Sequence, residues 1–136
     1  MTPLRAVLLF LALQLTTAAA TPPPPADMIL GIWRNPSGSI DVRTQPCGPD
    51  LCGVIVRASP QAAADAKDAG VGRLIGTQLL ENYQKIAPNK WAGTVYVPDM
   101  DRRFSSRIEA LTPTTLKISG CLMGEWLCKA QIWTRA

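Results

Sequence analysis

The chain has 136 residues, of which 47% are hydrophobic and 18% charged, and 14 Lys and Arg against 10 Asp and Glu give it a formal net charge of +4. This length accommodates one small domain. The sequence contains no histidine, which excludes Ser-His-Asp hydrolases, Cys-His proteases and histidine-ligated zinc sites.

Residues 1–20 have the pattern of a secretory signal peptide. Arg5 precedes a largely apolar run from Ala6 to Leu15, and three alanines follow at 18–20. We expect cleavage near Ala20, because the apolar run is about half as long as the roughly 20 residues of a membrane-spanning helix. An uncleaved anchor is the alternative. The mature chain is therefore expected to be periplasmic or secreted, with no transmembrane segment.

A proline-rich spacer is expected at residues 21–28, followed by the folded domain at residues 29–136. The spacer contains the segment TPPPPA, whose four consecutive prolines lack amide donors and favour the extended polyproline II conformation. We therefore expect the first strand no earlier than residue 29.

The four cysteines are Cys47, Cys52, Cys121 and Cys128. In an exported protein they meet an oxidising compartment, which favours disulfides over thiols or metal ligands. Three pairings are conceivable, and the short separations favour Cys47 with Cys52 and Cys121 with Cys128. Four free thiols are one alternative. A zinc site of four cysteines is another, although the intervals are mostly longer than in structural zinc sites.

From residue 29 onward, apolar and polar residues alternate, as in Leu116-Lys117-Ile118-Ser119. This period of two predicts half-buried strands. The expected strands cover residues 29–35, 39–45, 51–58, 74–82, 90–97, 102–110, 114–121 and 126–134. Residues 60–70 lack this alternation and are rich in helix formers, which predicts a short helix or a mobile flap over or beside the end of the sheet.

A series of eight strands leaves two exposed sheet edges unless the sheet closes. We therefore predict an all-β domain, a single antiparallel up-and-down β-barrel of about eight strands with one short helix or flap near 60–70. Such an interior is either filled by side chains or holds one small ligand. In the last hairpin, residues 123–126 are expected to form a four-residue loop that brings Cys121 opposite Cys128.

Five segments, in this order, resemble the exported bacterial proteins of the domain-of-unknown-function 2147 family (DUF2147). They are GIW at 31–33, LCGVIV at 51–56, WAGTVYVPD at 91–99, LKISG at 116–120 and QIWTR at 131–135. The resemblance implies a calycin-like or lipocalin-like barrel and an exported location, and it implies no particular activity. The chain departs from the family pattern at residues 99–103 and in the alanine-rich segment 60–73.

Gly31 and Trp33 also resemble the opening signature of lipocalins and avidins, in which a tryptophan closes one end of the barrel beneath an arginine of the final strand. Arg135 has the matching position in this chain. The resemblance therefore implies that Trp33 and Arg135 form a structural closure of the barrel, held by cation–π stacking.

Other candidate sites have less support. Asp99 and Asp101 supply few of the oxygen ligands that Ca²⁺ needs, and two arginines follow them, so a solvated turn is expected. Ser105 and Ser106 have no base beside them and are expected to be surface residues. We therefore predict no catalytic residue, no metal site and no cofactor. The basic residues are too scattered for a nucleic-acid site.

These observations predict a non-enzymatic binding or envelope-accessory protein whose barrel mouth accepts a small apolar or amphipathic ligand. Trp91, Tyr96 and Trp126 are the candidate ligand-binding residues. The alternative is a protein-interaction module, such as a periplasmic inhibitor of a hydrolase, with an envelope protein as its partner. The basic charge argues against a lysozyme target, since basic lysozymes attract acidic inhibitors. An enzyme is the third hypothesis. It ranks below the other two because the sequence offers no nucleophile with a base beside it.

Overall fold

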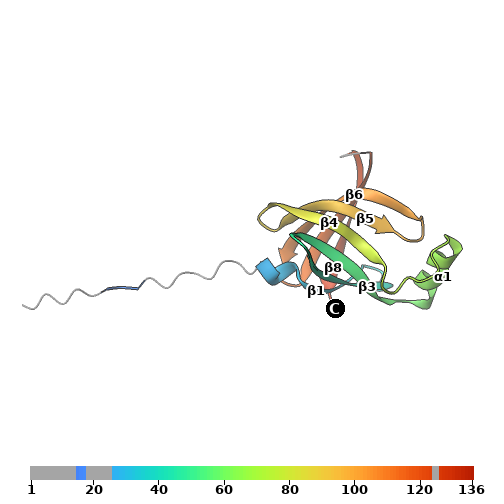
Figure 1. Cartoon of the computed structure of the whole chain (residues 1–136), viewed down its shortest axis with the longest axis horizontal. Helices are drawn as coiled ribbons and strands as arrows, with labels where there is room; N and C mark the ends of the chain where they lie inside the picture. Colours follow the sequence, from blue (N-terminus) through green and yellow to red (C-terminus); the bar gives the residue numbers. More distant parts are fainter. Residues whose placement is uncertain (1–14, 18–25, 124–125) are drawn as a thin grey trace, which may run out of the picture.

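The protein is described by a computed structural model that covers residues 15–17, 26–123 and 126–136. Eight strands form a closed antiparallel barrel, in which each strand pairs with the next along the chain and β8 pairs with β1 (Figure 1). The strands are β1 (Gly31–Arg34), β2 (Ile40–Cys47), β3 (Asp50–Ala58), β4 (Gln78–Ala87), β5 (Lys90–Val97), β6 (Arg102–Thr112), β7 (Thr115–Met123) and β8 (Trp126–Arg135). The predicted up-and-down barrel is confirmed.

Two helices accompany the strands. A 3₁₀ helix, η1 (Ala26–Ile29), precedes β1, and α1 (Pro60–Asp68) connects β3 to β4. The predicted signal peptide falls almost entirely on residues 1–14 and 18–20, which lie outside the described residues. Of the spacer expected at 21–28, residues 26–28 belong to η1. No helix among the described residues is long and apolar enough to cross a membrane.

The position of β4 differs most from its prediction, since the expected strand at 74–82 lies at Gln78–Ala87. Asn82 has a φ of 50°, and the register against β5 shifts between Glu81 and Gln84. This irregularity is a β-bulge, which interrupts the alternation of side chains that a sequence pattern relies on. The strand bends there and continues to the next turn.

Large side chains from most strands form the core inside the barrel. The most fully buried are Trp33, Val42, Ile55, Leu80, Tyr83, Ile108 and Leu116. Two glycines make room for them. A Cβ atom at Gly53 would overlap Leu80, and one at Gly93 would overlap Tyr83. Each bulky side chain therefore lies across a neighbouring strand that has no side chain at the point of contact.

The up-and-down topology divides the turns between two ends of the barrel. We call the end with η1, residues 47–50, residues 112–115 and the end of β8 the closed end. We call the end with residues 35–39, 59–77 and 98–101 the mouth. Figure 1 shows η1 and α1 at opposite ends of the barrel, and it shows the β7–β8 hairpin projecting beyond the neighbouring strands.

The helix α1 lies beside the mouth and is docked on the barrel. Ser59 caps its first turn by accepting a hydrogen bond from the Ala62 amide, and Pro60 occupies the first turn, where it needs no amide donor. Ala66 is buried in the main core cluster, and Ala62 packs against that cluster. The predicted short helix is therefore present, and Ala66 anchors it to the barrel.

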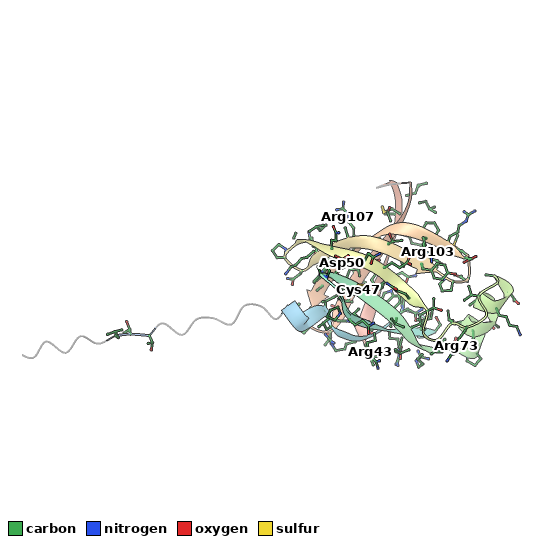
Figure 2. All side chains as sticks on the ribbon, viewed as in Figure 1. Arg43, Cys47, Asp50, Arg73, Arg103 and Arg107 are labelled. Carbon is green, nitrogen blue, oxygen red and sulfur yellow. A yellow bond between two sulfur atoms is a disulfide. The ribbon has the colours of Figure 1, made fainter. Side chains whose placement is uncertain are left out.

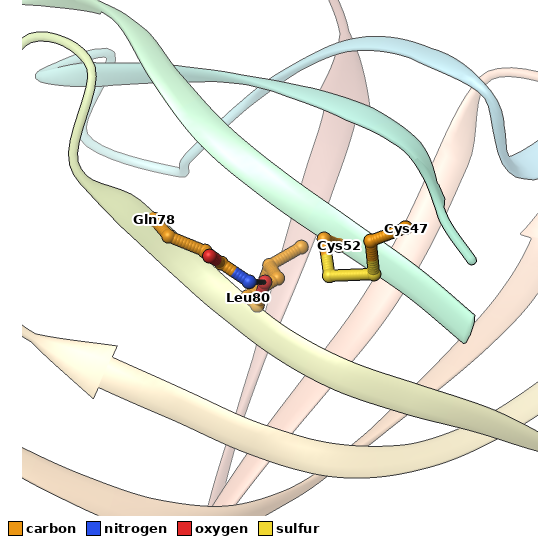
Figure 3. The surroundings of a disulfide bond; sticks show 4 residues. All are labelled: Cys47, Cys52, Gln78 and Leu80. Carbon is orange, nitrogen blue, oxygen red and sulfur yellow. Dashed lines mark hydrogen bonds between the residues drawn. A yellow bond between two sulfur atoms is a disulfide. The ribbon is translucent and has the colours of Figure 1, made fainter. Parts of the chain in front are cut away.

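Each disulfide joins the two strands of a different hairpin, which confirms the predicted pairing. Cys47 and Cys52 are bonded across the β2–β3 turn, with their Cα atoms 5.7 Å apart (Figure 3). Cys121 and Cys128 are opposite residues of β7 and β8, with Cα atoms 4.0 Å apart. This short distance is typical of an antiparallel pair without ladder hydrogen bonds. Two disulfides indicate a protein outside the cytoplasm.

The register of the last hairpin corrects one prediction. Met123 pairs with Trp126, so the strands continue past the disulfide and only residues 124–125 connect them. The four-residue loop expected at 123–126 is therefore wrong, because the ladder of paired residues extends one step further than the cysteine spacing suggested.

Candidate functional site

The closed end is plugged by Trp33 and Arg135, which face each other across β1 and β8. Trp33 is almost fully buried, and Cζ of Arg135 lies 4.2 Å from the centroid of its ring. The Arg135 guanidinium donates hydrogen bonds of 2.7–3.0 Å to three backbone carbonyls, those of Met28, Leu30 and Pro113. Its stacking on the indole contributes about 0.5–2 kcal/mol. One side chain thus holds η1 and the β6–β7 turn to the end of β8.

Gly31 allows this closure to form. Its φ of 139° lies in a region that side chains rarely adopt, and a Cβ atom there would overlap the guanidinium of Arg135. Nearby, the Trp33 indole donates to the Ile29 carbonyl, and the Thr44 hydroxyl donates to the same oxygen. These polar groups bind one another, so the closed end has the arrangement of a structural plug.

A cavity of about 740 Å³ opens at the mouth. Small-molecule sites commonly have volumes of roughly 300–1,000 Å³, apolar walls and a few polar groups. Side chains of the strands and of the segment before β4 form the apolar wall, among them Ile40, Leu74, Leu79, Val95, Phe104, Ile118 and Trp133. The β1–β2 turn, α1 and the β5–β6 turn form the rim.

Several polar side chains at the rim are engaged with one another. Asn35 donates to the Ser39 hydroxyl at 2.8 Å, and the Gln61 amide donates to the Asp65 carboxylate at 2.7 Å. These hydrogen bonds stabilise the β1–β2 turn and the first turns of α1. They use polar groups that would otherwise face the cavity.

The strand β8 brings two further polar side chains to the cavity, those of Lys129 and Gln131. The register pairs Gln131 with Ile118 and continues to a pairing of Trp133 with Leu116. Because alternate residues of a strand share one face, Lys129 and Gln131 belong to the inner row together with buried Trp133.

Lys129 and Gln131 were not predicted as cavity residues, because the apolar residues of this stretch occupy the opposite row. In Lys129-Ala130-Gln131-Ile132 the apolar residues Ala130 and Ile132 resemble the buried side of a strand. The register instead turns Ile132 outward, where 46% of its surface is exposed. The large aromatic residue Trp133 was the sequence signal that could have predicted which row of β8 faces inward, because Lys129 and Gln131 share its parity along the strand.

Tyr96 lines the mouth cavity at its rim. Cζ of Arg103, which is labelled in Figure 2, lies 4.6 Å from the centroid of the Tyr96 ring, and the Tyr96 hydroxyl donates to the Asp101 carboxylate at 2.6 Å. This hydrogen bond raises the pKa of Tyr96, because the carboxylate favours the neutral phenol. One face of the ring is therefore covered by Arg103.

The other two predicted ligand-binding residues have different outcomes. Trp91 does not line the mouth cavity; it is a buried core residue opposite Ile108. It lies near the start of β5, towards the closed end, with Nζ of Lys85 6.0 Å from its ring centroid. Its predicted place at the mouth is therefore corrected. Trp126 is the first residue of β8, and its side chain lies outside the part that the structure describes.

Two hydroxyl groups of the barrel interior, those of Tyr83 and Ser106, have no hydrogen-bond partner among the described residues. Both side chains are buried, so Ser106 is not the surface residue that the sequence analysis expected. Burial raises the pKa of Tyr83, because it disfavours the charged phenolate. Neither residue lines the mouth cavity.

The two acidic residues of the β5–β6 turn, Asp99 and Asp101, have different surroundings. Asp101 accepts the Tyr96 hydroxyl, whereas Asp99 lines the cavity rim. In the described ranges, no three His, Cys, Asp or Glu side chains lie close enough together to hold a metal ion.

A charged cluster clamps the outer face next to the mouth. Asp41 on β2 is only 5% exposed, and it accepts hydrogen bonds of 2.8 Å from Arg34 on β1 and from Arg57 on β3. The two guanidinium groups hold the pKa of Asp41 well below its usual range. This cluster fixes three neighbouring strands at the base of the β1–β2 turn.

A family model matches most of the chain. The family is described as "Uncharacterized protein conserved in bacteria (DUF2147)", and the match covers residues 31–135. This range runs from the first residue of β1 to the last residue of β8 and therefore includes the whole barrel. No curated protein and no solved structure matches the chain.

Proposed function

The chain belongs to the DUF2147 family, and we propose that its barrel binds a small apolar or amphipathic molecule at the mouth. The observation that carries this proposal is the cavity of about 740 Å³ and its largely apolar wall. Transfer of an apolar ligand from water onto such a wall is favourable in proportion to the apolar area that is buried.

The two ends of the barrel support one route of entry. The Trp33–Arg135 plug fills the closed end, whereas the mouth has turns and a short helix around an opening. A ligand would therefore enter from the mouth and advance along the inner row of β8 towards Trp133.

The proposed role is binding without catalysis, in the periplasm or outside the cell. The absence of histidine from the sequence removes the commonest general base. The two disulfides favour an oxidising compartment, and residues 1–20 have the pattern of a signal peptide that would deliver the chain there.

Titration with dodecanol, a neutral single-chain molecule, tests this proposal. Trp133 lines the cavity, so binding is expected to change the tryptophan fluorescence in a saturable way. Trp133→Phe should abolish most of that change while calorimetry still detects binding. Trp91→Phe is the matched control and should retain the change, since Trp91 does not line the cavity. Absence of saturable binding up to the solubility limit of dodecanol would contradict the proposal.

A second candidate function, a protein-interaction module, has one observation in its favour. Leu122 and Leu127 are 59% and 69% exposed on the β7–β8 hairpin, which projects from the barrel (Figure 1). Native mass spectrometry of the protein purified from its own cell envelope separates the two functions. A retained small molecule supports ligand binding, and a co-purifying protein in a fixed ratio supports the interaction module.

A further inference from the structure

The wall of the mouth cavity carries a cation, and we propose that the cavity selects amphiphiles with an anionic head group. This inference rests on the proposed function and adds the class of head group to it. Lys129 supplies the positive charge and Gln131 supplies a neutral hydrogen-bond donor, both from the inner row of β8.

The order of residues along β8 places a head group and a chain in the cavity. From the mouth towards the closed end, the inner row is Lys129, Gln131 and then buried Trp133. A chain that packs against Trp133 and Ile118 therefore has its head beside Lys129. Gly120 pairs with Lys129 on β7 and contributes no side chain, and a Cβ atom there would contact Val95 of the cavity wall.

The donors of this pair are available to a ligand. Gln131 accepts a hydrogen bond from the Trp133 indole through Oε1 at 3.2 Å, so its Nε2 amide remains the group that can donate. Lys129 takes part in none of the three ion pairs found in the described part of the chain. An ammonium group and an amide donor together match a carboxylate or another oxyanion.

Two carboxylates also line the cavity and oppose an anion. Asp65 lies on α1, where it already accepts a hydrogen bond from Gln61, and Asp99 lies on the β5–β6 turn. Both belong to the elements of the rim, whereas Lys129 lies on the strand wall. The head group beside Lys129 is therefore expected to experience the ammonium more strongly than either carboxylate.

A series of ligands with one tail and different heads tests the proposal. Calorimetry on the purified protein would compare dodecanoate, dodecanol and dodecyltrimethylammonium at low salt. The two ionic molecules are kept below their micelle concentrations, and dodecanol is kept below its solubility limit. We expect dodecanoate to bind about tenfold more tightly than dodecanol. Dodecyltrimethylammonium should bind most weakly of the three.

Lys129→Met should weaken dodecanoate about tenfold and leave dodecanol unchanged. Lys117→Met is the matched control, because it removes the same charge from the outer row of the neighbouring strand and should leave the preference intact. Lys129→Gln is a second variant that retains a polar side chain. A thermal melt of each variant verifies that it is folded.

Each contrary outcome has its own meaning. Equal binding of dodecanoate and dodecanol, or equal effects of the two lysine substitutions, would overturn the selection of an anionic head and leave the apolar cavity in place. A preference for dodecyltrimethylammonium would also overturn it, with Asp65 and Asp99 as the dominant charges. Failure of all three molecules to bind would instead contradict the proposed function.

Discussion

The closed end and the mouth of this barrel treat their polar groups differently. At the closed end, Arg135 donates to three backbone carbonyls and the Trp33 indole donates to a fourth. At the mouth, the Lys129 ammonium has no ion pair among the described residues, although the cavity beside it is largely apolar. Lys129 is exposed at the mouth, so its ammonium group is accessible to a ligand. The contrast therefore separates an end that serves stability from an end that can serve a ligand.

Two cations of one strand show the same contrast. Arg135 and Lys129 both belong to the inner row of β8, and they have opposite surroundings. Arg135 lies on the Trp33 ring and is surrounded by carbonyl oxygens, whereas Lys129 lies opposite Gly120 in an open cavity. Substitution of Arg135 should affect folding, and substitution of Lys129 should affect binding.

The largest expected effect on stability comes from a substitution at the closed end. Trp33→Ala should lower the free energy of unfolding by about 3–5 kcal/mol, as truncation of a large core side chain does. Denaturant unfolding would measure this loss, and the dodecanol affinity of the folded fraction should not change. Leu127→Ala at the exposed rim is the control, with an expected change within about 0.5 kcal/mol. A loss below about 1 kcal/mol for Trp33→Ala would contradict its role as the plug.

The two disulfides provide a matched comparison of the ends. Replacement of either cysteine pair by serines should cost about 2–3 kcal/mol, because each disulfide closes a short loop. Cys121 lines the mouth cavity, whereas Cys47 and Cys52 lie at the closed end. Only the Cys121/Cys128 replacement should therefore weaken dodecanol binding. Equal effects of both replacements on affinity would show that the ends are not independent.

The charged cluster beside the mouth gives a prediction on pH. Asp41→Asn should cost about 2 kcal/mol, since the carboxylate accepts hydrogen bonds from two arginines. The folded state lowers the pKa of Asp41, so the stabilisation is complete above about pH 4 and is lost as the pH falls further. Denaturant midpoints measured across this range should vary less in the variant than in the parent. Asp68→Asn, at the exposed end of α1, should retain the parent's pH profile.

The smallest expected effect concerns the helix beside the mouth. α1 has nine residues and one buried anchor, Ala66, and a helix this short is marginal without its packing. Its amides should exchange with solvent before those of the strands, and dodecanol should slow exchange in α1 more than in β1. Protection of 60–68 equal to that of the strands, without any ligand, would assign the helix to the rigid core instead.

Alternation and turn residues predict most of this fold, because strands that are buried on one face leave a period of two in the sequence. The strand expected at 114–121, which contains Leu116 and Ile118, is found at Thr115–Met123. The bulge at Asn82 was not predicted, although asparagine is depleted in strands and adopts a positive φ more readily than most residues. Its consequence is the displaced prediction for β4.

The candidate site was predictable only in part. Trp33 and Arg135 occupy the positions of the tryptophan and arginine that close lipocalin and avidin barrels, and the structure places the two side chains in contact. Prediction of the cavity residues at the mouth requires knowing which row of β8 faces inward. The pairing with β7 places Lys129 in the inner row and Ile132 in the outer row, and only this register shows it.

The mouth of the barrel is expected to bind a ligand, and the closed end is not. A two-dimensional amide NMR titration with dodecanol tests this expectation most directly. We predict saturable shifts at cavity residues, with Leu79, Val95 and Ile118 as the reporters, and unchanged signals at Trp33 and Thr44. Shifts at Trp33 and Thr44 without shifts at the cavity residues would contradict this expectation.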